Sequence, residues 1–213
     1  MVGAFIVFEG IDGSGKSTAI GEISARLETQ GLSCLALREP TEKTDASREI
    51  RRILRTAKEI DDQISKDLLD LFLIDRLWDI RHQILPALQA GKIVLLDRYF
   101  FSTAAYQSMN TAQIASILDA YLANNQVLLP DLVVFLDLPV QIALERMNTR
   151  AQLDVFETEA RLTRIAANYR EVFRKFSTTR SEPEVETRTN ELTTADFEAL
   201  SARIRQLALA DRR

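Results

Sequence analysis

The first residues that could do chemistry lie near the start of the chain, in the stretch VFEGIDGSGKST (residues 7–18). Gly10 to Ser17 match the spacing G-x-x-x-x-G-K-S/T, in which a glycine-rich turn directs backbone N–H groups toward an anion. Lys16 would reach the β- and γ-phosphates of a nucleoside triphosphate, and the Ser17 hydroxyl would bind Mg²⁺. A glycine-rich turn without a ligand is the alternative. The predicted phosphate-binding residues are Gly10, Ile11, Asp12, Gly13, Ser14, Gly15, Lys16, Ser17 and Thr18.

Such a loop needs a strand before it and a helix after it, and the hydrophobic pattern predicts both. Residues 4–8 (AFIVF) form a short apolar run, and apolar side chains at helical spacing follow over residues 16–30. The same reasoning predicts strands over 32–37, 93–96 and 132–136, a weaker strand over 184–189, and helices over 47–56, 64–88, 111–124, 140–150, 156–176 and 196–209.

The alternation of strands and helices predicts an α/β fold. Strands that are apolar throughout are typical of a parallel sheet covered by helices on both faces. In such folds the ligand binds at the carboxyl ends of the strands. The first four predicted strands end in Glu9-Gly10, Arg38-Glu39, Asp97-Arg98 and Asp137. We therefore expect these charged groups to gather at one edge of the sheet, around the phosphate loop.

The composition bounds the possible partners. The 213-residue chain is 46% hydrophobic and 27% charged, which is typical of a globular protein. Its net charge of −4 gives no overall positive field for a nucleic-acid polymer, although local lysines and arginines suit a small anion. No apolar stretch approaches the roughly 18 residues of a membrane span, and the single cysteine, Cys34, has no internal disulfide partner. We expect a cytoplasmic protein without membrane contact.

Five segments resemble, in order, those of thymidylate kinases, which are P-loop nucleoside monophosphate kinases. They are FEGIDGSGKST; REPT followed by REIRRIL; LFLIDR with a long helix to ILPALQAGK; LLDRYFFSTAAYQ; and LDLPVQIALERMNTR with LDVFE. The resemblance runs from Phe5 to about Tyr169, and the tail after Ser177 carries no recognisable family segment. It implies one P-loop kinase domain over residues 1–213, with a five-stranded parallel sheet, helices on both faces and a lid at about 146–157.

The resemblance also implies a reaction, the transfer of the γ-phosphoryl group of Mg·ATP to dTMP to give dTDP and ADP. Because the acceptor is already a phosphate oxyanion, catalysis needs positioning and charge neutralisation more than acid–base chemistry. ATP and dTMP would then be the small-molecule partners and Mg²⁺ the cofactor. The family further implies a homodimer, with the predicted helix over 64–88 at the interface.

Residues across the chain would hold the acceptor, as the resemblance implies. Phe72 and Arg76 are four residues apart on one predicted helix and therefore share a face; they would stack on thymine and contact the base or phosphate. Tyr106 would lie against the deoxyribose, and Asp97 would lie near Mg²⁺ together with Ser17. The implied acceptor-binding residues are Asp12, Arg38, Phe72, Arg76, Arg98, Ser102, Thr103, Tyr106 and Gln107.

Four basic side chains form the implied catalytic set, namely Lys16, Arg98, Arg146 and Arg150. Arg98 would contact the phosphate of the acceptor. Gly13 stands where some family members have an arginine, and such glycine-containing members are expected to supply the catalytic arginine from the lid. Arg146 and Arg150 are four residues apart at the start of the implied lid. A solvated basic helix face is the alternative interpretation of this pair.

Two departures from the family pattern leave the acceptor open. Thr41-Glu42-Lys43 stand where many bacterial members have glycines, and Ser108 replaces the glycine that usually follows Tyr106-Gln107. A kinase for another (deoxy)nucleoside monophosphate, or for a deoxynucleoside, is therefore one alternative. A regulatory module that binds nucleotide without turnover is a second alternative.

Overall fold

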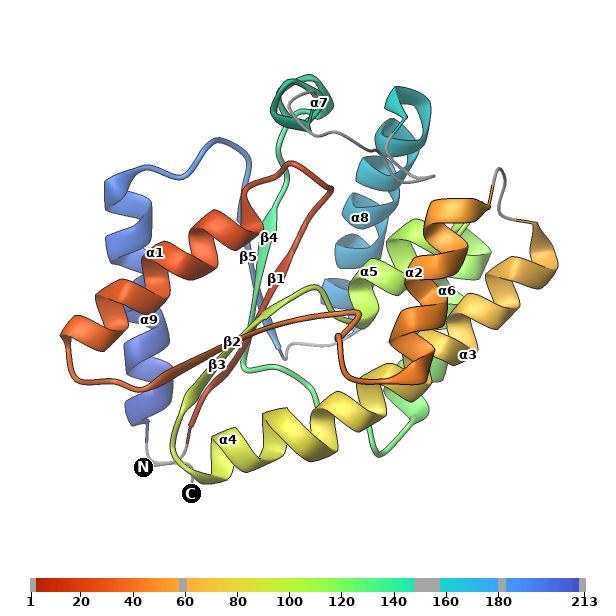
Figure 1. Ribbon diagram of the computed structural model, residues 1–213. Coiled ribbons are helices and arrows are strands. Elements are labelled where there is room, and N and C mark those ends of the chain that lie inside the picture. Colours follow the sequence, from red (N-terminus) through yellow and green to blue (C-terminus); the bar gives the residue numbers. More distant parts are fainter. Residues whose placement is uncertain (1–2, 58–60, 148–157, 180–182, 211–213) are drawn as a thin grey trace.

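A parallel β-sheet forms the centre of the molecule (Figure 1). The structure is a computed structural model that describes residues 3–57, 61–147, 158–179 and 183–210. Within these ranges the sheet has five strands in the order β2-β3-β1-β4-β5, and every strand pair is parallel. The strands are β1 (Phe5–Glu9), β2 (Cys34–Arg38), β3 (Ile93–Asp97), β4 (Leu132–Leu136) and β5 (Glu184–Arg188).

The predicted parallel α/β fold is confirmed, with one difference in burial. All residues of β1, β3 and β4 are buried, as the apolar runs require. The second strand is apolar as well, yet its residues are half-buried or exposed. The reason is its position: β2 lies at the edge of the sheet and pairs only with β3. One side of β2 therefore borders open space near the site described below.

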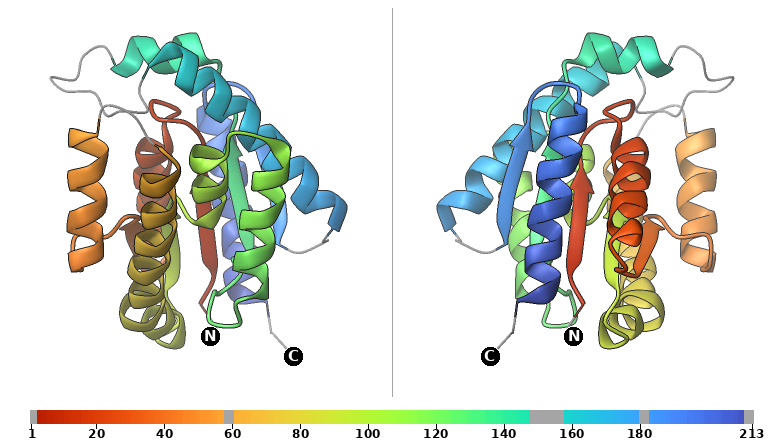
Figure 2. Two further views of the ribbon diagram at one scale, coloured as in Figure 1. Left: turned by 90° about the vertical axis from the view of Figure 1, so that its right-hand side faces the viewer. Right: turned by 90° about the vertical axis from the view of Figure 1, so that its left-hand side faces the viewer.

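Helices cover both faces of the sheet, and each face has its own hydrophobic core. Figure 2 shows α1 and α9 side by side on one face, with the other long helices on the opposite face. The helices are α1 (Lys16–Thr29), α2 (Asp45–Thr56), α3 (Asp62–Asp79), α4 (Leu85–Gln89), α5 (Phe100–Gln107), α6 (Thr111–Ala123), α7 (Val140–Met147), α8 (Glu159–Thr179) and α9 (Thr194–Leu209).

Two helical segments differ from the sequence prediction. The predicted helix over 64–88 contains a π-helical turn, Ile80–Ile84, between α3 and α4. This turn ends two residues before Pro86, which has no N–H group to continue the α-helical hydrogen bonds. Helix α5 was not predicted at all. Every residue of α5 except Tyr106 is buried, so its sequence lacks the polar face by which an amphipathic helix is recognised.

The implied lid at 146–157 falls largely outside the described residues. Helix α7 ends at Met147, so Arg146 is described whereas Arg150 and the rest of the implied lid are not. Among the helices of the described ranges, none combines the length and the apolar character that crossing a bilayer requires.

Candidate active site

The phosphate loop connects β1 to α1 through backbone conformations that require glycine. Gly10 has φ 145° and Gly13 has φ 78°. A Cβ atom at Gly10 would lie 2.6 Å from the carbonyl oxygen of Leu136, and one at Gly13 would lie 2.5 Å from that of Ala143. The first turn of α1 receives no side-chain cap, because its N-cap residue is Gly15. Its N–H groups and the positive end of the helix dipole are therefore available to an anion.

Lys16 lies inside this loop with only 5% of its surface exposed. Its Nζ donates to the carbonyl oxygens of Gly10, at 3.0 Å, and Ile11, at 2.9 Å. Burial, followed by the charge of Arg98, lowers the pKa of Lys16 to about 8. Nζ thus bonds to the loop's own carbonyl oxygens, and an anion in the loop would supply a stronger partner.

Ser17 and Asp97, the two residues expected near Mg²⁺, lie in direct contact. The Ser17 hydroxyl donates to Oδ2 of Asp97 at 3.1 Å. The other carboxylate oxygen, Oδ1, is buried and has no hydrogen-bond partner in the described part of the chain. A hydroxyl and an unpartnered carboxylate oxygen beside a phosphate loop are hard oxygen ligands of the kind that Mg²⁺ prefers. The side chains present therefore fit a magnesium ion held together with nucleotide phosphates.

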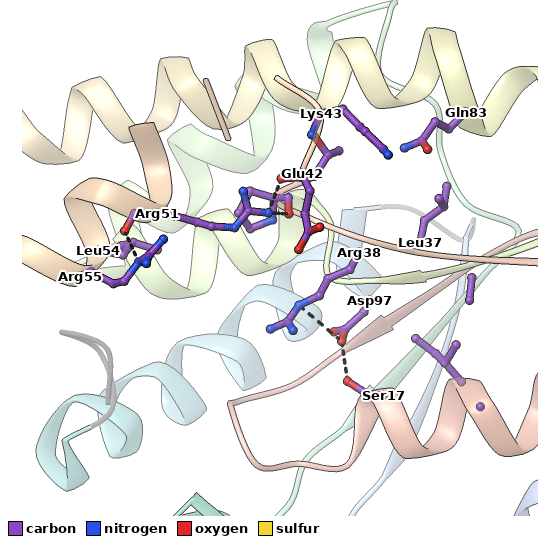
Figure 3. A pocket seen from close by; sticks show the side chains of 15 residues that line it. Ser17, Leu37, Arg38, Glu42, Lys43, Arg51, Leu54, Arg55, Gln83 and Asp97 are labelled. Atoms are coloured by element: carbon purple, nitrogen blue, oxygen red, sulfur yellow. Dashed lines mark hydrogen bonds and ion pairs between the residues drawn. The ribbon is translucent and has the colours of Figure 1, made fainter. Parts of the chain in front are cut away.

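A large cavity of about 830 Å³ opens beside this pair, at the uncovered edge of β2. Figure 3 shows its basic side chains, with Arg38 directed toward Asp97. The Arg38 side chain is 65% exposed, and its Nε lies 4.0 Å from Oδ2 of Asp97. On the α2 side, Arg51 donates to the carbonyl oxygen of Pro40 at 2.9 Å. Arg38 also lines a second, smaller cavity, so it stands between the two.

Arg98 connects the loop to this second cavity. Its backbone has φ 72°, a left-handed conformation that is rare outside glycine. Its Nη1 donates to the Gly10 carbonyl at 3.2 Å, which is the same oxygen that Lys16 contacts. Its Nη2 donates to Oδ1 of Asp12 at 2.7 Å and to the Tyr106 hydroxyl at 2.8 Å. Burial alone would raise the pKa of Asp12, but the charges of Arg98 and Lys16 outweigh it and lower that pKa.

The second cavity, of about 110 Å³, brings together residues from five segments of the chain. All nine residues that the sequence implied for the acceptor line it. The remaining lining residues are Glu39, Pro40, Leu54 and Tyr99. The structure thus gathers the whole implied acceptor set in one place, which we call the acceptor cavity.

Arg76 is fixed at one wall of the acceptor cavity by a buried ion pair. Its Nε and Nη2 both donate to Oε2 of Glu39, at 2.8 and 2.5 Å, and the two side chains are 1% and 2% exposed. Its guanidinium also lies 4.9 Å from the ring centre of Tyr99. Burial raises the pKa of Glu39, and the charge and hydrogen bonds of Arg76 oppose that shift. Removing either partner would leave a buried charge uncompensated.

Several polar atoms around this cavity have no partner in the described residues. They are Nη1 of Arg76, Oε1 of Glu39, and both side-chain amide atoms of Gln107. Buried polar groups are nearly always hydrogen-bonded in folded proteins, so unpartnered ones around a cavity mark positions where a ligand can bind. Together they offer a flat polar molecule a cationic hydrogen-bond donor, a carboxyl oxygen that can accept, and an amide group that can both donate and accept.

The loop that departs from the family pattern is docked on α3. The backbone N–H and the hydroxyl of Thr41 donate to Asp75 at 2.7 and 2.6 Å, and the Thr44 hydroxyl donates to the same carboxylate at 2.6 Å. Thr44 also caps α2 through the N–H of Ser47. Asp75 lies next to Arg76, so these bonds tie the altered loop to the wall of the acceptor cavity.

Arg146 lies on the loop side rather than in the acceptor cavity. Its Nη1 donates to the Gly13 carbonyl at 3.2 Å, and its Nη2 pairs with Glu191. It would also lie 3.3 Å from a Cβ atom at Gly15, which places its guanidinium beside the start of α1. Of the two implied lid arginines it is the described one.

Sequence reasoning placed Glu9 and Glu39 among the charged strand ends near the loop but gave them no role, and it missed a third buried residue, Tyr169. Glu9 and Glu39 are fully buried and bond to residues around Arg98 or to Arg76. Both follow apolar runs directly, so a charged residue at the end of a buried strand was the available signal. Tyr169 donates to Glu9 at 2.9 Å from the middle of α8, and no sequence spacing links the two.

The parallel sheet, the glycine-rich loop after β1 and two adjoining cavities lined by cations define a P-loop nucleotide-binding protein. A family model described as thymidylate kinase matches residues 8–192. The chain is 42% identical to a thymidylate kinase of Leptospira borgpetersenii over 80% of this chain and 82% of the relative. It is 42% identical to one of Akkermansia muciniphila over 75% of this chain and 74% of the relative. It is also 38% identical to a probable thymidylate kinase of Pyrococcus horikoshii over 79% of this chain and 82% of the relative.

The chain therefore belongs to the thymidylate kinase family, which consists of nucleoside monophosphate kinases. The resemblance drawn from motifs is confirmed, but its extent was underestimated. It was traced to about Tyr169, whereas the family model extends to residue 192 and so includes β5. Charged residues dominate the segment around β5, which explains why short apolar motifs did not reveal it.

Proposed function

We propose that this protein transfers the γ-phosphoryl group of ATP to dTMP, giving ADP and dTDP. An oxygen of the dTMP phosphate forms the new bond to the γ-phosphorus, and the bond to the bridging β–γ oxygen breaks with its electron pair remaining on ADP. The observation that carries the proposal is the convergence of Lys16 and Arg98 on the Gly10 carbonyl oxygen. This places a donor-side cation next to an acceptor-side cation, as transfer between two anions demands.

The basic side chains would neutralise charge at successive points of the transfer. Lys16 would leave the loop carbonyls for the β- and γ-phosphates, and Arg98 and Arg38 would hold the acceptor phosphate. Arg146 would add charge at the loop from α7, and the same role is open to Arg150. Ser17 and Asp97 would hold Mg²⁺, which would supply positive charge that reduces the repulsion between the nucleotide phosphates and the incoming acceptor.

The unpartnered atoms of the acceptor cavity suit thymine. Nη1 of Arg76 can only donate, so it favours a ring carbonyl oxygen over the amino group of cytosine. Phe72 offers a ring face to the base, and Gln107 and Thr103 offer further hydrogen bonds. Tyr106, whose hydroxyl is bonded to Asp12 and Arg98, would lie against the deoxyribose and oppose a 2′-hydroxyl. Asp12 would lie near the 3′-hydroxyl.

We further propose one domain over 1–213 with a lid at about 146–157, a cytoplasmic location and a homodimer. The support for a homodimer is on α3, the helix that carries Phe72 and Arg76. Ile74 projects from it with 57% of its surface exposed and is one of the few large hydrophobic side chains that are exposed in the described residues. Light scattering of purified protein, with Ile74→Lys as the disrupting variant, tests the oligomeric state.

The function is tested by measuring ADP release from Mg·ATP across dTMP, dUMP, CMP, UMP, GMP, AMP and thymidine. We expect a strong preference for dTMP, with a product that carries one additional phosphate. Activity on a different monophosphate would support the proposed kinase activity but reject the assignment of the base pocket to thymine. Activity on thymidine alone would reject the role of Arg98. ATP binding without turnover of any acceptor would favour the regulatory module.

A further inference from the structure

Glu9 is a fully buried carboxylate at the end of β1, directly before the phosphate loop. Its two oxygens accept four hydrogen bonds. Oε1 accepts from the backbone N–H groups of Tyr99, at 2.8 Å, and Ser102, at 3.3 Å. Oε2 accepts from the Ser102 hydroxyl, at 2.5 Å, and from the Tyr169 hydroxyl, at 2.9 Å. Such complete satisfaction of a buried acid indicates that its position is specified by the surroundings.

One half of this arrangement fixes the start of α5. The N-cap residue of α5 is Tyr99, and it provides no side-chain cap. Glu9, at the end of β1, provides the cap instead. Its Oε1 accepts hydrogen bonds from two backbone N–H groups at the start of α5. A negative charge is also favoured at this end of a helix. Helix α5 carries Ser102, Thr103, Tyr106 and Gln107, so its start sets where one wall of the acceptor cavity lies.

The other half sets the direction of two hydroxyl protons. A carboxylate can only accept, so the protons of Ser102 and Tyr169 point toward Glu9, directly or through the 2.7 Å contact between the two hydroxyls. Lone pairs on both oxygens then face Arg98, whose Nη1 donates to Ser102 at 3.2 Å and to Tyr169 at 3.1 Å. Burial raises the pKa of Glu9, and the hydrogen bonds from the Ser102 and Tyr169 hydroxyls and the Tyr99 N–H, together with the charge of Arg98, offset part of that rise.

This arrangement gives each end of the Arg98 guanidinium a fixed set of partners beside the acceptor cavity, which Ser102 also lines. Nη1 is bound by the hydroxyl pair, whereas Nη2 points to Asp12 and Tyr106, which line that cavity. The left-handed backbone of Arg98 costs energy for a non-glycine residue, so its side chain must be held by strong partners.

We propose that Glu9 and Tyr169 form a positioning unit that orients Arg98 toward the acceptor phosphate by fixing the hydroxyl protons of Ser102 and Tyr169. Neither residue touches the acceptor, and both act through Arg98. The inference rests on the proposed function, in which Arg98 binds that phosphate.

Glu9→Gln is the sharpest test because it keeps the shape of the side chain and reverses its hydrogen-bonding character. The new amide group donates to one hydroxyl, which must then turn its own proton toward Arg98, where two donors would face each other. We expect the KM for dTMP to rise about tenfold or more, as the loss of a hydrogen bond to a charged group predicts. The KM for ATP and kcat should stay within about threefold.

Tyr169→Phe tests the same unit from α8 and keeps the ring contacts with Phe135 and Phe173. The KM for dTMP should rise by a smaller factor, and the double variant should show less than the product of the two single effects because both act on one network. The matched control is Glu171→Gln, which removes a carboxylate charge on α8 two residues away, where it pairs with Arg174. We expect it to match the wild type.

The outcomes separate the two claims. A wild-type protein that does not phosphorylate dTMP rejects the proposed function. If the wild type phosphorylates dTMP but Glu9→Gln and Tyr169→Phe leave the KM for dTMP unchanged, the positioning unit is rejected. If Glu9→Gln does not fold, Tyr169→Phe decides alone: a raised KM for dTMP with normal ATP binding supports the unit, and an unchanged KM overturns it.

Discussion

The two sides of the active site are built differently. On the acceptor side two of the three arginines are buried and held by protein side chains: Arg76 by Glu39, and Arg98 by Asp12, Tyr106 and the hydroxyl pair behind it. The third, Arg38, is 65% exposed. On the donor side Lys16 is buried, but its Nζ bonds to backbone carbonyl oxygens of the loop, which an anion could replace. The Ser17 side chain is exposed, and the Arg146 guanidinium contacts Glu191 at the surface and a loop carbonyl. The acceptor side is therefore preformed by the fold, whereas the donor side leaves its bonds to be made by nucleotide and metal.

The difference has a physical reason. A nucleotide donor brings three phosphates and a metal ion, which supply strong partners to any nearby N–H group or cation. The acceptor brings one phosphate and a base with few polar atoms. Distinguishing such a molecule requires groups that are already oriented, since an unmet hydrogen bond in a dry cavity is what rejects the wrong base.

The largest effect is expected from the substitution Arg76→Met, which removes the cation of the buried acceptor-side ion pair. This variant leaves Glu39 buried without its cation, and we expect a loss of about 3 kcal/mol in the free energy of unfolding, measured with urea. The double variant Glu39→Gln/Arg76→Met removes both charges and should recover much of this loss without recovering dTMP turnover. Equal stability of wild type and Arg76→Met would contradict a preformed ion pair.

The substitution Lys16→Met removes the loop cation on the donor side, and it should lower activity rather than stability. We expect kcat to fall about 10²- to 10³-fold, as for removal of one group that stabilises the transition state. Because the variant removes a buried charge, the free energy of unfolding should not decrease. A loss of stability comparable to that of Arg76→Met would show that both sides are equally built into the fold.

Tyr106→Phe sharpens the comparison within the acceptor cavity. The ring, which lies 4.7 Å from the Arg98 guanidinium, is retained, while the hydroxyl bonded to Asp12 and Arg98 is lost. We expect the KM for dTMP to rise about tenfold with little change in the KM for ATP. Steady-state kinetics with each substrate varied separately measures this, and an equal rise in both constants would argue against a separate acceptor side.

ATP binding should change the protonation of Lys16, because its Nζ is proposed to exchange loop carbonyl oxygens for phosphate oxygens. Its pKa is lowered to about 8 by burial, so near pH 8 about half of the molecules carry it neutral in the absence of nucleotide. Phosphates favour the charged form, so ATP binding at pH 8 should take up roughly half a proton, and binding at pH 6.5 almost none. Calorimetry in buffers of different ionisation enthalpy measures the uptake; no uptake at pH 8 would mean that Lys16 does not leave the loop carbonyls for the phosphates.

The smallest effect is expected at the exposed pair of Arg146 and Glu191, whose side chains are 38% and 59% exposed. Glu191→Gln should change the free energy of unfolding by less than about 0.5 kcal/mol, because surface ion pairs contribute little. Chemical denaturation measures this change. A value above about 1 kcal/mol would show that this donor-side pair contributes substantially to the stability of the fold.

Apolar runs and fixed spacings predicted the sheet and the glycine-rich loop, because they encode local structure. The acceptor residues came from the family resemblance; the structure brings them around one cavity, and their roles stay a prediction. Sequence reasoning did not predict helix α5, whose near-complete burial removes any periodic signal. It placed Glu9 and Glu39 at the edge of the sheet but gave them no role, and it missed Tyr169, because the hydrogen-bond partners of all three lie far away in the chain. Glu9 and Tyr169, for example, are 160 positions apart and meet only in the folded protein. Side-chain networks of this kind follow from tertiary packing and leave no spacing to recognise.

The most direct test of a preformed acceptor side is the binding of dTMP to the protein without ATP or Mg²⁺, measured by calorimetry. We predict saturable binding of one dTMP per chain, with a dissociation constant that changes by less than about fivefold when Mg²⁺ and a non-hydrolysable ATP analogue are added; a fivefold change corresponds to only about 1 kcal/mol. If dTMP binds only after the analogue is present, the donor side completes the acceptor cavity, and the distinction between the two sides is wrong.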